Sequence, residues 1–199
     1  MAQSKETATE TVTVTASPGE APARIAIRRI DAHEAEARAA ALAASLADVL
    51  VDCVEGGASV SFMLPLTHDR AAAFWTRVLA GVARGERALL VAEDAAGRVV
   101  GTVQLVMDLP ENQPHRADVA KMLVHRDARR RGVAQALLAA LDDVARAEGR
   151  RVLVLDTVTG GDAERLYARQ GWQRVGSVPA YALMPDGAEC GTTFFHKRL

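Results

Sequence analysis

Apolar and polar positions alternate with a period of two over residues 24–30, which is the pattern of a strand with one buried face. Asp31 follows in the position of a helix N-cap, with Glu34 three residues later. A stripe of Ala, Leu and Val then continues to about Cys53. The first unit is therefore predicted to be a strand followed by one long helix.

A second helix and a strand pair are predicted after an uncharged linker at residues 56–66. Thr67 is the expected N-cap of this helix, which ends at Arg84-Gly85. Two β-rich runs follow at residues 88–92 and 98–106, joined by a short loop that contains a glycine. We expect these two runs to form an antiparallel pair.

The rest of the chain continues to alternate strands with helices. In order, the sequence predicts a strand at residues 117–124, a helix that opens at 129–134 and lasts to Gly149, a strand at 151–155, a short helix capped by Asp162 and ended by Gly171, and two strands at 173–178 and 192–197. These elements predict one α/β domain over residues 23–199, with a mixed, mostly antiparallel sheet of about seven strands and about four flanking helices.

Residues 1–22 are rich in Thr, Ser, Pro and Glu and contain little to bury, so they are predicted to be a flexible N-terminal leader. The alternation Thr11-Val12-Thr13-Val14-Thr15 leaves an edge strand open as an alternative for part of it. A secretory signal begins with basic residues followed by an apolar run. The leader has neither, so it is not predicted to be such a signal.

Composition narrows the functional classes. Of the 199 residues, 49% are hydrophobic, which excludes disorder for most of the chain. A formal net charge of −1 gives no general attraction to nucleic acid or to an anionic membrane. Cys53 and Cys190 are far apart, and the histidines lack metal-binding spacing, so neither a disulfide framework nor a metal site is predicted. We expect a cytoplasmic protein without nucleic-acid or membrane partners.

The run Arg129-Arg130-Arg131-Gly132-Val133-Ala134 lies between a predicted strand and a predicted helix. The first turn of a helix has unpaired backbone N–H groups and the positive end of the helix dipole, so a turn that enters it can bind an anion. Gly132 and Ala134 leave space for backbone amides to approach a phosphate. The run is neither the phosphate loop of NTPases nor a dinucleotide fingerprint, because the lysine and the glycines that these motifs need are missing.

This run resembles the Gln/Arg-x-x-Gly-x-Gly/Ala motif of the GCN5-related N-acetyltransferase (GNAT) superfamily. The segment Ala163-Glu164-Arg165-Leu166-Tyr167-Ala168-Arg169-Gln170-Gly171-Trp172 resembles that family's Ala-x-x-Leu-Tyr-x-x-x-Gly-Phe motif. The resemblance implies the GNAT fold, whose sheet is splayed between the fourth and fifth strands, here those that end at Val124 and Leu155. It also implies acetyl-CoA as cosubstrate, bound by Met122, Leu123, Val124, Arg129, Arg130, Arg131, Gly132, Val133, Ala134, Ala163 and Tyr167.

The chain departs from the family pattern at two positions. Gly160 stands where many members have an asparagine, which removes a side-chain contact to the cofactor, and Arg126 replaces a common proline in the turn. Residues 110–118 and 181–187 are similar to the tabtoxin-resistance branch, which acetylates a small β-lactam amino acid. That likeness implies resistance to a toxin or an antibiotic by acetylation.

The implied reaction needs an acid for the leaving thiolate and a base for the amine. Tyr167 is expected to be the acid, because it lies one helical turn after Ala163 and its phenol can be directed at the sulfur. Asp156 follows a buried strand at the sheet edge where ligands of α/β proteins bind, and it is the expected base. Glu111, Asp118 and a chain of water molecules remain alternatives for the base.

The resemblance places the acceptor between the linker of the first two helices and the sheet edge near the splay. The predicted acceptor-binding residues are Asp52, Glu55, Phe62, Asn112, Gln113 and Asp118. Carboxylates among them would hold an ammonium, and Arg116 a carboxylate, so the expected acceptor is a small zwitterionic amine. A protein or peptide N-acetyltransferase and a non-catalytic acyl-CoA sensor stay open as alternatives, as does the choice between monomer and homodimer.

Overall fold

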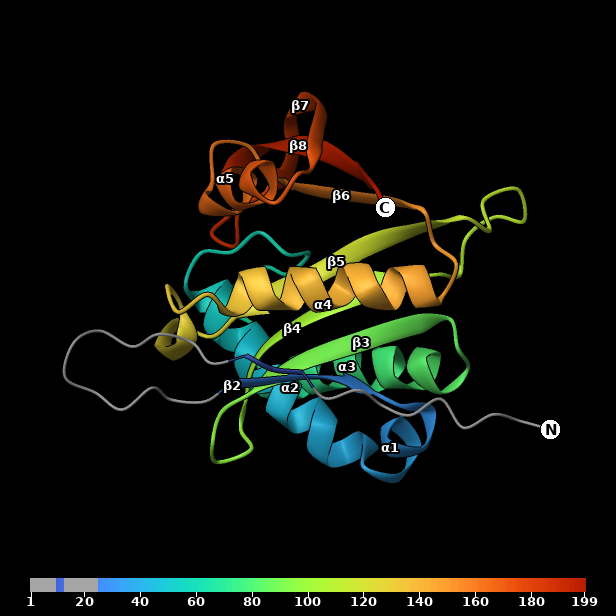
Figure 1. Cartoon of the computed structure of the whole chain (residues 1–199). Helices are drawn as coiled ribbons and strands as arrows, with labels where there is room; N and C mark the ends of the chain where they lie inside the picture. The colour runs from blue at the N-terminus through green and yellow to red at the C-terminus, as the bar shows by residue number, and fades with distance from the viewer. Residues whose placement is uncertain (1–9, 13–24) are drawn as a thin grey trace.

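The computed structural model describes residues 10–12 and 25–199, which form one mixed sheet with helices on both faces (Figure 1). The strands are β1 (Glu10–Val12), β2 (Ile25–Ile30), β3 (Arg87–Glu93), β4 (Val99–Val106), β5 (Arg116–Val124), β6 (Val152–Val158), β7 (Gln173–Leu183) and β8 (Glu189–Arg198). The helices are α1 (Ala32–Ala37), α2 (Ala39–Glu55), α3 (His68–Ala83), α4 (Val133–Ala147) and α5 (Asp162–Arg169), with a short 3-10 turn η1 at Arg126–Ala128. The predicted α/β class is confirmed.

The sheet opens between β5 and β6. The strand order is β1-β2-β3-β4-β5-β6-β8-β7, and every neighbouring pair is antiparallel except β5 with β6. These two strands pair only where residues 116–118 face residues 152–154, and beyond that point they diverge (Figure 1). The predicted splay is therefore confirmed. Along it, the inner edge of each strand has backbone N–H and C=O groups that can bind an extended ligand.

Helices cover the two faces of the sheet because its strands send alternate side chains to opposite sides. On one face Leu137 of α4 lies in a buried cluster with Leu105 of β4. On the other face Leu46 of α2 and Trp75 of α3 lie in a second cluster with Leu89 of β3. Burial of each such side chain is worth roughly 1.5–3 kcal/mol, so the two layers hold the paired part of the sheet rigid beside the splay.

The long helix predicted after Asp31 is two helices. Asp31 is the N-cap as predicted, and its carboxylate accepts a hydrogen bond from the Glu34 amide at 2.8 Å. The chain leaves the helical conformation at Arg38 (φ −117°, ψ 18°), and α2 begins at the next residue. The break lets the two helices follow separate directions while Ala35 and Leu42 both stay buried.

Two boundaries near the C-terminus also differ from the prediction. Asp162 is the first residue of α5 and not its cap, because Gly161 occupies the N-cap position without a side-chain hydrogen bond. Strands β7 and β8 are longer than the predicted 173–178 and 192–197, and they form one long hairpin. The segment 181–187, which was singled out for its likeness to a family branch, includes the tip of this hairpin.

Most of the predicted leader at residues 1–22 lies outside the described residues and stays a prediction there. Glu10–Val12 is described and forms β1, which pairs with β2 so that Val12 lies opposite Ile25. This strand corresponds to the alternative that the Thr and Val alternation left open. Within the described ranges, no helix is long and apolar enough to cross a membrane.

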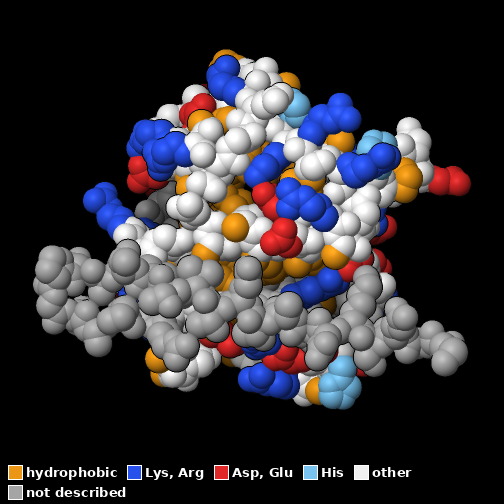
Figure 2. All heavy atoms as spheres, in the orientation of Figure 1, with side chains coloured by type: hydrophobic (Ala, Val, Ile, Leu, Met, Phe, Trp, Pro, Cys, Tyr) orange, Lys and Arg blue, Asp and Glu red, His pale blue; other side chains and the backbone are white. Residues whose placement is uncertain are grey.

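The described part of the face shown in Figure 2 has Lys and Arg side chains interspersed with Asp and Glu. This mixture agrees with the formal net charge of −1. Charges of both signs on one surface form local ion pairs more readily than one extended field. The chemistry of the molecule therefore depends on particular groups of side chains rather than on its overall charge.

Candidate active site

The turn after β5 presents backbone amides at the start of α4. Arg130 (φ 60°) and Gly132 (φ 77°) have left-handed backbone conformations that fold the chain back on itself. The first intrahelical hydrogen bond of α4 runs from the Ala136 amide to the Gly132 carbonyl at 3.0 Å, so the amides before Ala136 point out of the helix without helical partners. A Cβ at Gly132 would meet nothing within 4 Å, so the turn is an open cradle. It fits an anion.

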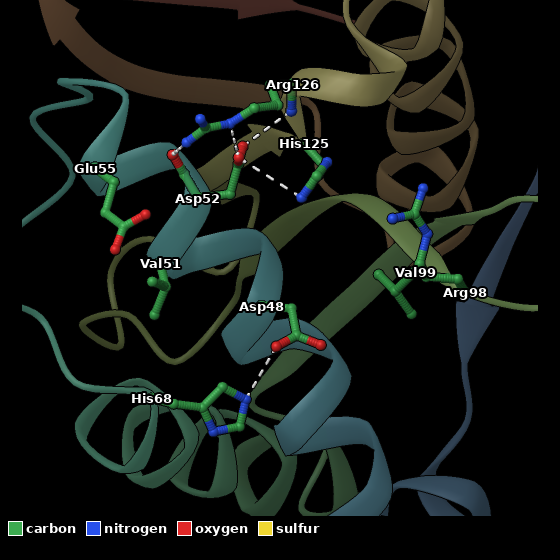
Figure 3. A pocket seen from close by; sticks show the side chains of 9 residues that line it. All are labelled: Asp48, Val51, Asp52, Glu55, His68, Arg98, Val99, His125 and Arg126. Atoms are coloured by element: carbon green, nitrogen blue, oxygen red, sulfur yellow. Dashed lines mark hydrogen bonds and ion pairs between the residues drawn. The ribbon is translucent and has the colours of Figure 1, made fainter.

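A buried carboxylate of α2 holds this turn in place (Figure 3). Asp52 is 7% exposed and accepts a hydrogen bond from the Arg126 amide at 2.9 Å and another from the Arg126 side chain. Arg129 Nη2 and His125 Nε2 lie 3.5 Å and 3.6 Å from the same carboxylate. Because these contacts join α2 to the chain between β5 and α4, Asp52 fixes the entry to the anion cradle.

The three arginines of the turn have different surroundings. Arg129 Nε donates to the Val124 carbonyl at 3.0 Å, so this guanidinium is directed back at the end of β5 and at Asp52. Arg130 and Arg131 have no carboxylate partner among the described residues. These two side chains therefore supply the charge that is free to reach an anion. The sequence pattern did not distinguish them from Arg129.

Cys53 is buried beside the same turn. Its thiol donates to the Val124 carbonyl at 3.6 Å, and burial raises its pKa. A thiol in this state is a small hydrophobic group and not a nucleophile. It packs the end of α2 against β5.

Tyr167 and Asp156 lie together at the splay. The ring of Tyr167 packs edge-on against Trp172, with centroids 5.8 Å apart, and lies 6.1 Å from Phe195. Burial raises the pKa of the phenol, and the negative charge of Asp156 raises it further, so the hydroxyl stays protonated. Within the described part of the chain this hydroxyl has no hydrogen-bond partner. It is a donor without an acceptor.

Asp156 is exposed at the surface of the splay, but protein atoms crowd one side of it, and this partial desolvation raises the pKa of its carboxyl. The charge of Lys121 lowers that pKa and the charge of Asp118 raises it. The balance is a carboxylate that accepts a proton more readily than an ordinary aspartate. Such a group is suited to the work of a base.

Lys121 is a site residue that the sequence reasoning missed. It has a left-handed backbone (φ 52°) at an irregularity in the pairing of β4 with β5. Its ammonium lies 5.5 Å from the centre of the Phe74 ring and donates to Ser61 Oγ at 3.3 Å. The signal that was available is a single lysine inside the otherwise short and apolar run Val119-Ala120-Lys121-Met122-Leu123-Val124.

The acetyltransferase (GNAT) family model matches residues 58–172, which is more than half of the chain. The chain belongs to this family. A GCN5-related N-acetyltransferase from Kribbella flavida is 26% identical, with a TM-score of 0.68 and coverage of 87% of this chain and 98% of that one. A ribosomal-protein-alanine N-acetyltransferase from Brucella melitensis is 24% identical, with a TM-score of 0.66 and coverage of 87% and 99%.

The protein yncA from Salmonella typhimurium, whose structure contains its cofactor acetyl-CoA, is 21% identical. Its TM-score is 0.66, and the alignment covers 88% of this chain and 94% of that one. These three proteins are similar to this chain in fold, and the similarity agrees with the observed sheet and its splay. The nearer resemblance to the tabtoxin-resistance branch stays a prediction.

Only some of the predicted acceptor residues of this GNAT chain lie near the splay. Phe62 packs edge-on against Phe74, with ring centroids 5.3 Å apart, and so reaches the surroundings of Lys121. Asp118 is the last residue of β5 that pairs with β6, and it forms an ion pair with Arg116. The predicted role of Arg116 in holding a carboxylate therefore competes with this internal pair.

Asn112 and Gln113 lie at the other end of β5. Gln113 Oε1 accepts from Arg116 Nε at 2.8 Å, in the loop that precedes the strand. This loop and the linker between α2 and α3 are at opposite ends of the sheet in Figure 1. The nine residues of β5 extend over about 26 Å, so the structure does not bring Asn112 and Gln113 opposite the linker.

Asp52 and Glu55 lie on the outer side of α2, in a surface pocket of about 470 Å³ (Figure 3). The pocket is lined by Asp48, Val51, Asp52, Glu55, His68, Arg98, Val99, His125 and Arg126. The carboxylate of Asp52 is already engaged by the turn, which leaves it no room to hold an ammonium at the splay. The structure therefore places the Asp52 carboxylate against the turn that enters α4 rather than at the splay.

Proposed function

We propose that this protein transfers the acetyl group of acetyl-CoA to the primary amine of a small, zwitterionic molecule. The observation that carries the proposal is the open edge between β5 and β6, which has an anion cradle at its far end and the unpartnered Tyr167 hydroxyl beside it. Membership of the GNAT family supports the same reaction class. The identity of the amine is inferred from the chemistry around the splay.

The residues present fit acetyl-CoA. The pantetheine arm has amide groups that can pair with the free inner edge of β5, including Met122, Leu123 and Val124. The pyrophosphate fits the amides at the start of α4, over Gly132, Val133 and Ala134, with Arg130 and Arg131 beside it. When bound there, acetyl-CoA supplies an activated thioester close to Asp156 and Tyr167.

Asp52→Asn is expected to raise the KM for acetyl-CoA with little change in kcat. Asparagine keeps one acceptor oxygen, but its NH2 group replaces the other oxygen and faces an Arg126 donor, so one of the two hydrogen bonds is lost. Hydrogen bonds to charged groups are worth about 1.5–3 kcal/mol. The turn then loses its fixed position while the splay is unchanged. Steady-state kinetics with varied acetyl-CoA measure the effect.

Asp48→Asn is the matched control, because Asp48 lies one turn earlier on the same helix and faces the same pocket, where it pairs with the exposed His68 at 3.1 Å (Figure 3). This variant should keep the KM of the wild-type protein. A normal KM for Asp52→Asn, in a protein that remains folded, would count against the anchoring role.

The transfer step forms a C–N bond between the amine and the acetyl carbonyl carbon and breaks the C–S bond of the thioester. Tyr167 donates its phenol hydrogen to the departing sulfur, whose free thiol has a pKa of ~8.5. Because burial keeps the phenol protonated, the donor is always present, and the proton that it gives up is replaced by the one that the amine loses. The amine must arrive without its extra proton, which Asp156 accepts.

Asp156→Asn should flatten the rise of kcat/KM with pH. In the wild-type protein the rate increases as pH passes the raised pKa of Asp156, because only the carboxylate is a base. The asparagine amide cannot accept the proton, so the pH profile of the variant should follow only the deprotonation of the acceptor amine. An unchanged profile would transfer the role to Glu111, Asp118 or water.

The same pKa shift has a consequence for stability. A carboxyl whose pKa is raised in the folded state favours folding below its unfolded pKa, and this contribution is lost as pH rises through the folded value. Asp156→Asn should therefore be at least as stable as the wild-type protein at neutral pH. Denaturant titrations at pH 7 check this, and they also exclude misfolding as the reason for any lost activity.

The linker between α2 and α3 limits the size of the acceptor. Its Ser59 hydroxyl donates to the Leu183 carbonyl at 2.7 Å, and its Leu64 amide donates to the Pro185 carbonyl at 3.0 Å. The linker is thus tied to the β7–β8 hairpin across the mouth of the splay. This favours a compact amine over a protein tail, and the likeness to the tabtoxin-resistance branch favours a β-lactam amino acid or a similar antibiotic among compact amines.

A screen of small amino compounds for CoA release tests the proposal. Release that depends on the amine supports catalysis, whereas acetyl-CoA binding without release by any amine would identify a sensor. Efficient acetylation of peptide N-termini or lysine peptides, with amino-acid-sized amines inert, would assign the protein to the peptide class instead. Each result selects one of the three functions.

A further inference from the structure

Three polar side chains share the sheet face under α3, next to the splay. Arg87 of β3 donates through Nη1 to Gln104 Oε1 of β4 at 3.2 Å. Gln104 lies opposite Ala120 of β5, and Lys121 is the next residue along that strand. Burial lowers the pKa of the Lys121 ammonium, the charge of Asp156 raises it, and the positive charge of Arg87 lowers it further, so the two cations are near enough to interact.

The two cations lack the partners that similar groups have elsewhere in the described chain. Arg28, which is partly buried as Lys121 and Arg87 are, pairs with Glu34 at 2.6 Å and Glu93 at 2.7 Å. Among the described residues, Lys121 contacts the Ser61 hydroxyl and the face of Phe74, and Arg87 donates to the Gln104 amide oxygen. The charges of Asp156 and Glu86 act on Lys121 and Arg87, respectively, only from beyond ion-pair distance. Two half-buried like charges without a carboxylate in contact are costly unless an anion joins them.

Gln104 gives an independent indication that these polar side chains lack a hydrogen-bond acceptor. Its side chain is fully buried, and its Nε2 has no hydrogen-bond partner. A buried donor that stays unpaired costs about 1–3 kcal/mol, and such atoms are rare in folded proteins. The Gln104 amide nitrogen is therefore a buried donor without an acceptor, next to the guanidinium of Arg87.

We propose that Lys121 binds a carboxylate of the acceptor, and that Arg87, oriented by Gln104, adds the second positive charge behind it. The inference deepens the proposed function, on which it rests, by naming the acceptor as a molecule that has its amine and a carboxylate close together, as an α-amino acid does. Lys121 lies near enough to Asp156 for each charge to shift the pKa of the other. A zwitterion fits that pair with its carboxylate at Lys121 and its amine at Asp156.

The test compares L-amino acids with their carboxamides as acceptors. The wild-type protein should prefer the acids in kcat/KM, and Lys121→Met should reduce the preference by about tenfold to a hundredfold, the value of one charge-assisted hydrogen bond. Methionine is uncharged, is only one atom shorter than lysine, and can keep an apolar contact with Phe74. Arg77→Met, which removes an exposed arginine of α3 that forms no ion pair with any described residue, is the control and should keep the preference.

A binding measurement separates this inference from the proposed function. The chain has only three lysines, Lys5, Lys121 and Lys197, so ¹³C-methylated lysine resonances can be assigned with the Lys121→Met variant. N-acetylglycine should shift the Lys121 resonance and raise its pKa, whereas N-acetylglycinamide should do neither. This difference between the two compounds is expected even if no amine in the screen is acetylated.

An equal response of Lys121 to both compounds, or to neither, would overturn the carboxylate site. An acid preference that survives Lys121→Met would overturn it as well. A carboxylate-specific shift without CoA release from any amine would instead support the site and reject the transferase.

Discussion

Gly132→Glu is expected to abolish the binding of acetyl-CoA. Gly132 lies at the N-cap of α4 with φ 77°, and open space surrounds the position where a Cβ would stand. A glutamate there would fill the cradle and add a negative charge beside the expected site of the pyrophosphate, which carries negative charge itself. Calorimetry with acetyl-CoA should show no binding at concentrations that saturate the wild-type protein.

Gly149→Glu is a matched control for the strain that any side chain suffers at a positive φ. Gly149 lies just after the other end of α4, with φ 70° and no atom within 4 Å of an added Cβ. Left-handed backbone costs roughly 1–2 kcal/mol for a residue with a Cβ, so both variants should lose a similar amount of stability. Only Gly132→Glu should lose the ligand, and normal affinity in that variant would disprove the assignment of the cradle.

The fold could be predicted from the sequence because most of its signals are local. Alternation with a period of two marked β2, a capping residue marked the start of α3, and the glycine at 132 marked the turn into α4. The break at Arg38 was not visible, because arginine is a good helix former and the apolar stripe continues through it. What ends α1 is the packing of two separate helices, which no window of sequence contains.

The site was predicted less completely, because its contacts join distant residues. Asp52 was expected to face the acceptor since it lies at the end of a helix beside the linker, yet its partner Arg126 is 74 residues away. The sequence shows the carboxylate but not the direction of its side chain. A buried acid on an apolar helix face was the available sign that it has a fixed cationic partner.

Asn112 and Gln113 were misplaced for a different reason. The family resemblance placed them at the sheet edge near the splay, opposite the linker, and they come directly before β5 in the sequence. A strand separates its two ends by its full length, so residues before β5 lie far from the turn that follows it. Lys121 is in the middle of that strand, and this is why it reaches both the linker and the splay.

Tyr167→Phe is expected to lower kcat by ~10²–10⁴, the usual value of general acid catalysis, with acetyl-CoA affinity nearly unchanged. Phenylalanine keeps the packing against Trp172 and Phe195, and the lost hydroxyl has no partner among the described residues, so folding should be unaffected. The loss should therefore appear in turnover alone. Single-turnover measurements at saturating acetyl-CoA and amine report it without interference from product release.

Tyr181→Phe is the matched control, because the chain has only two tyrosines and Tyr181 is exposed on β7, where it packs edge-on against Phe194 at 5.5 Å. The same chemical change there should leave turnover within about twofold of the wild-type value, since surface substitutions usually change little. A loss of less than about tenfold for Tyr167→Phe, in an assay limited by chemistry, would reject the acid role. The thiolate would then leave without a proton from this residue, and the buried phenol would serve only to close the splay against water.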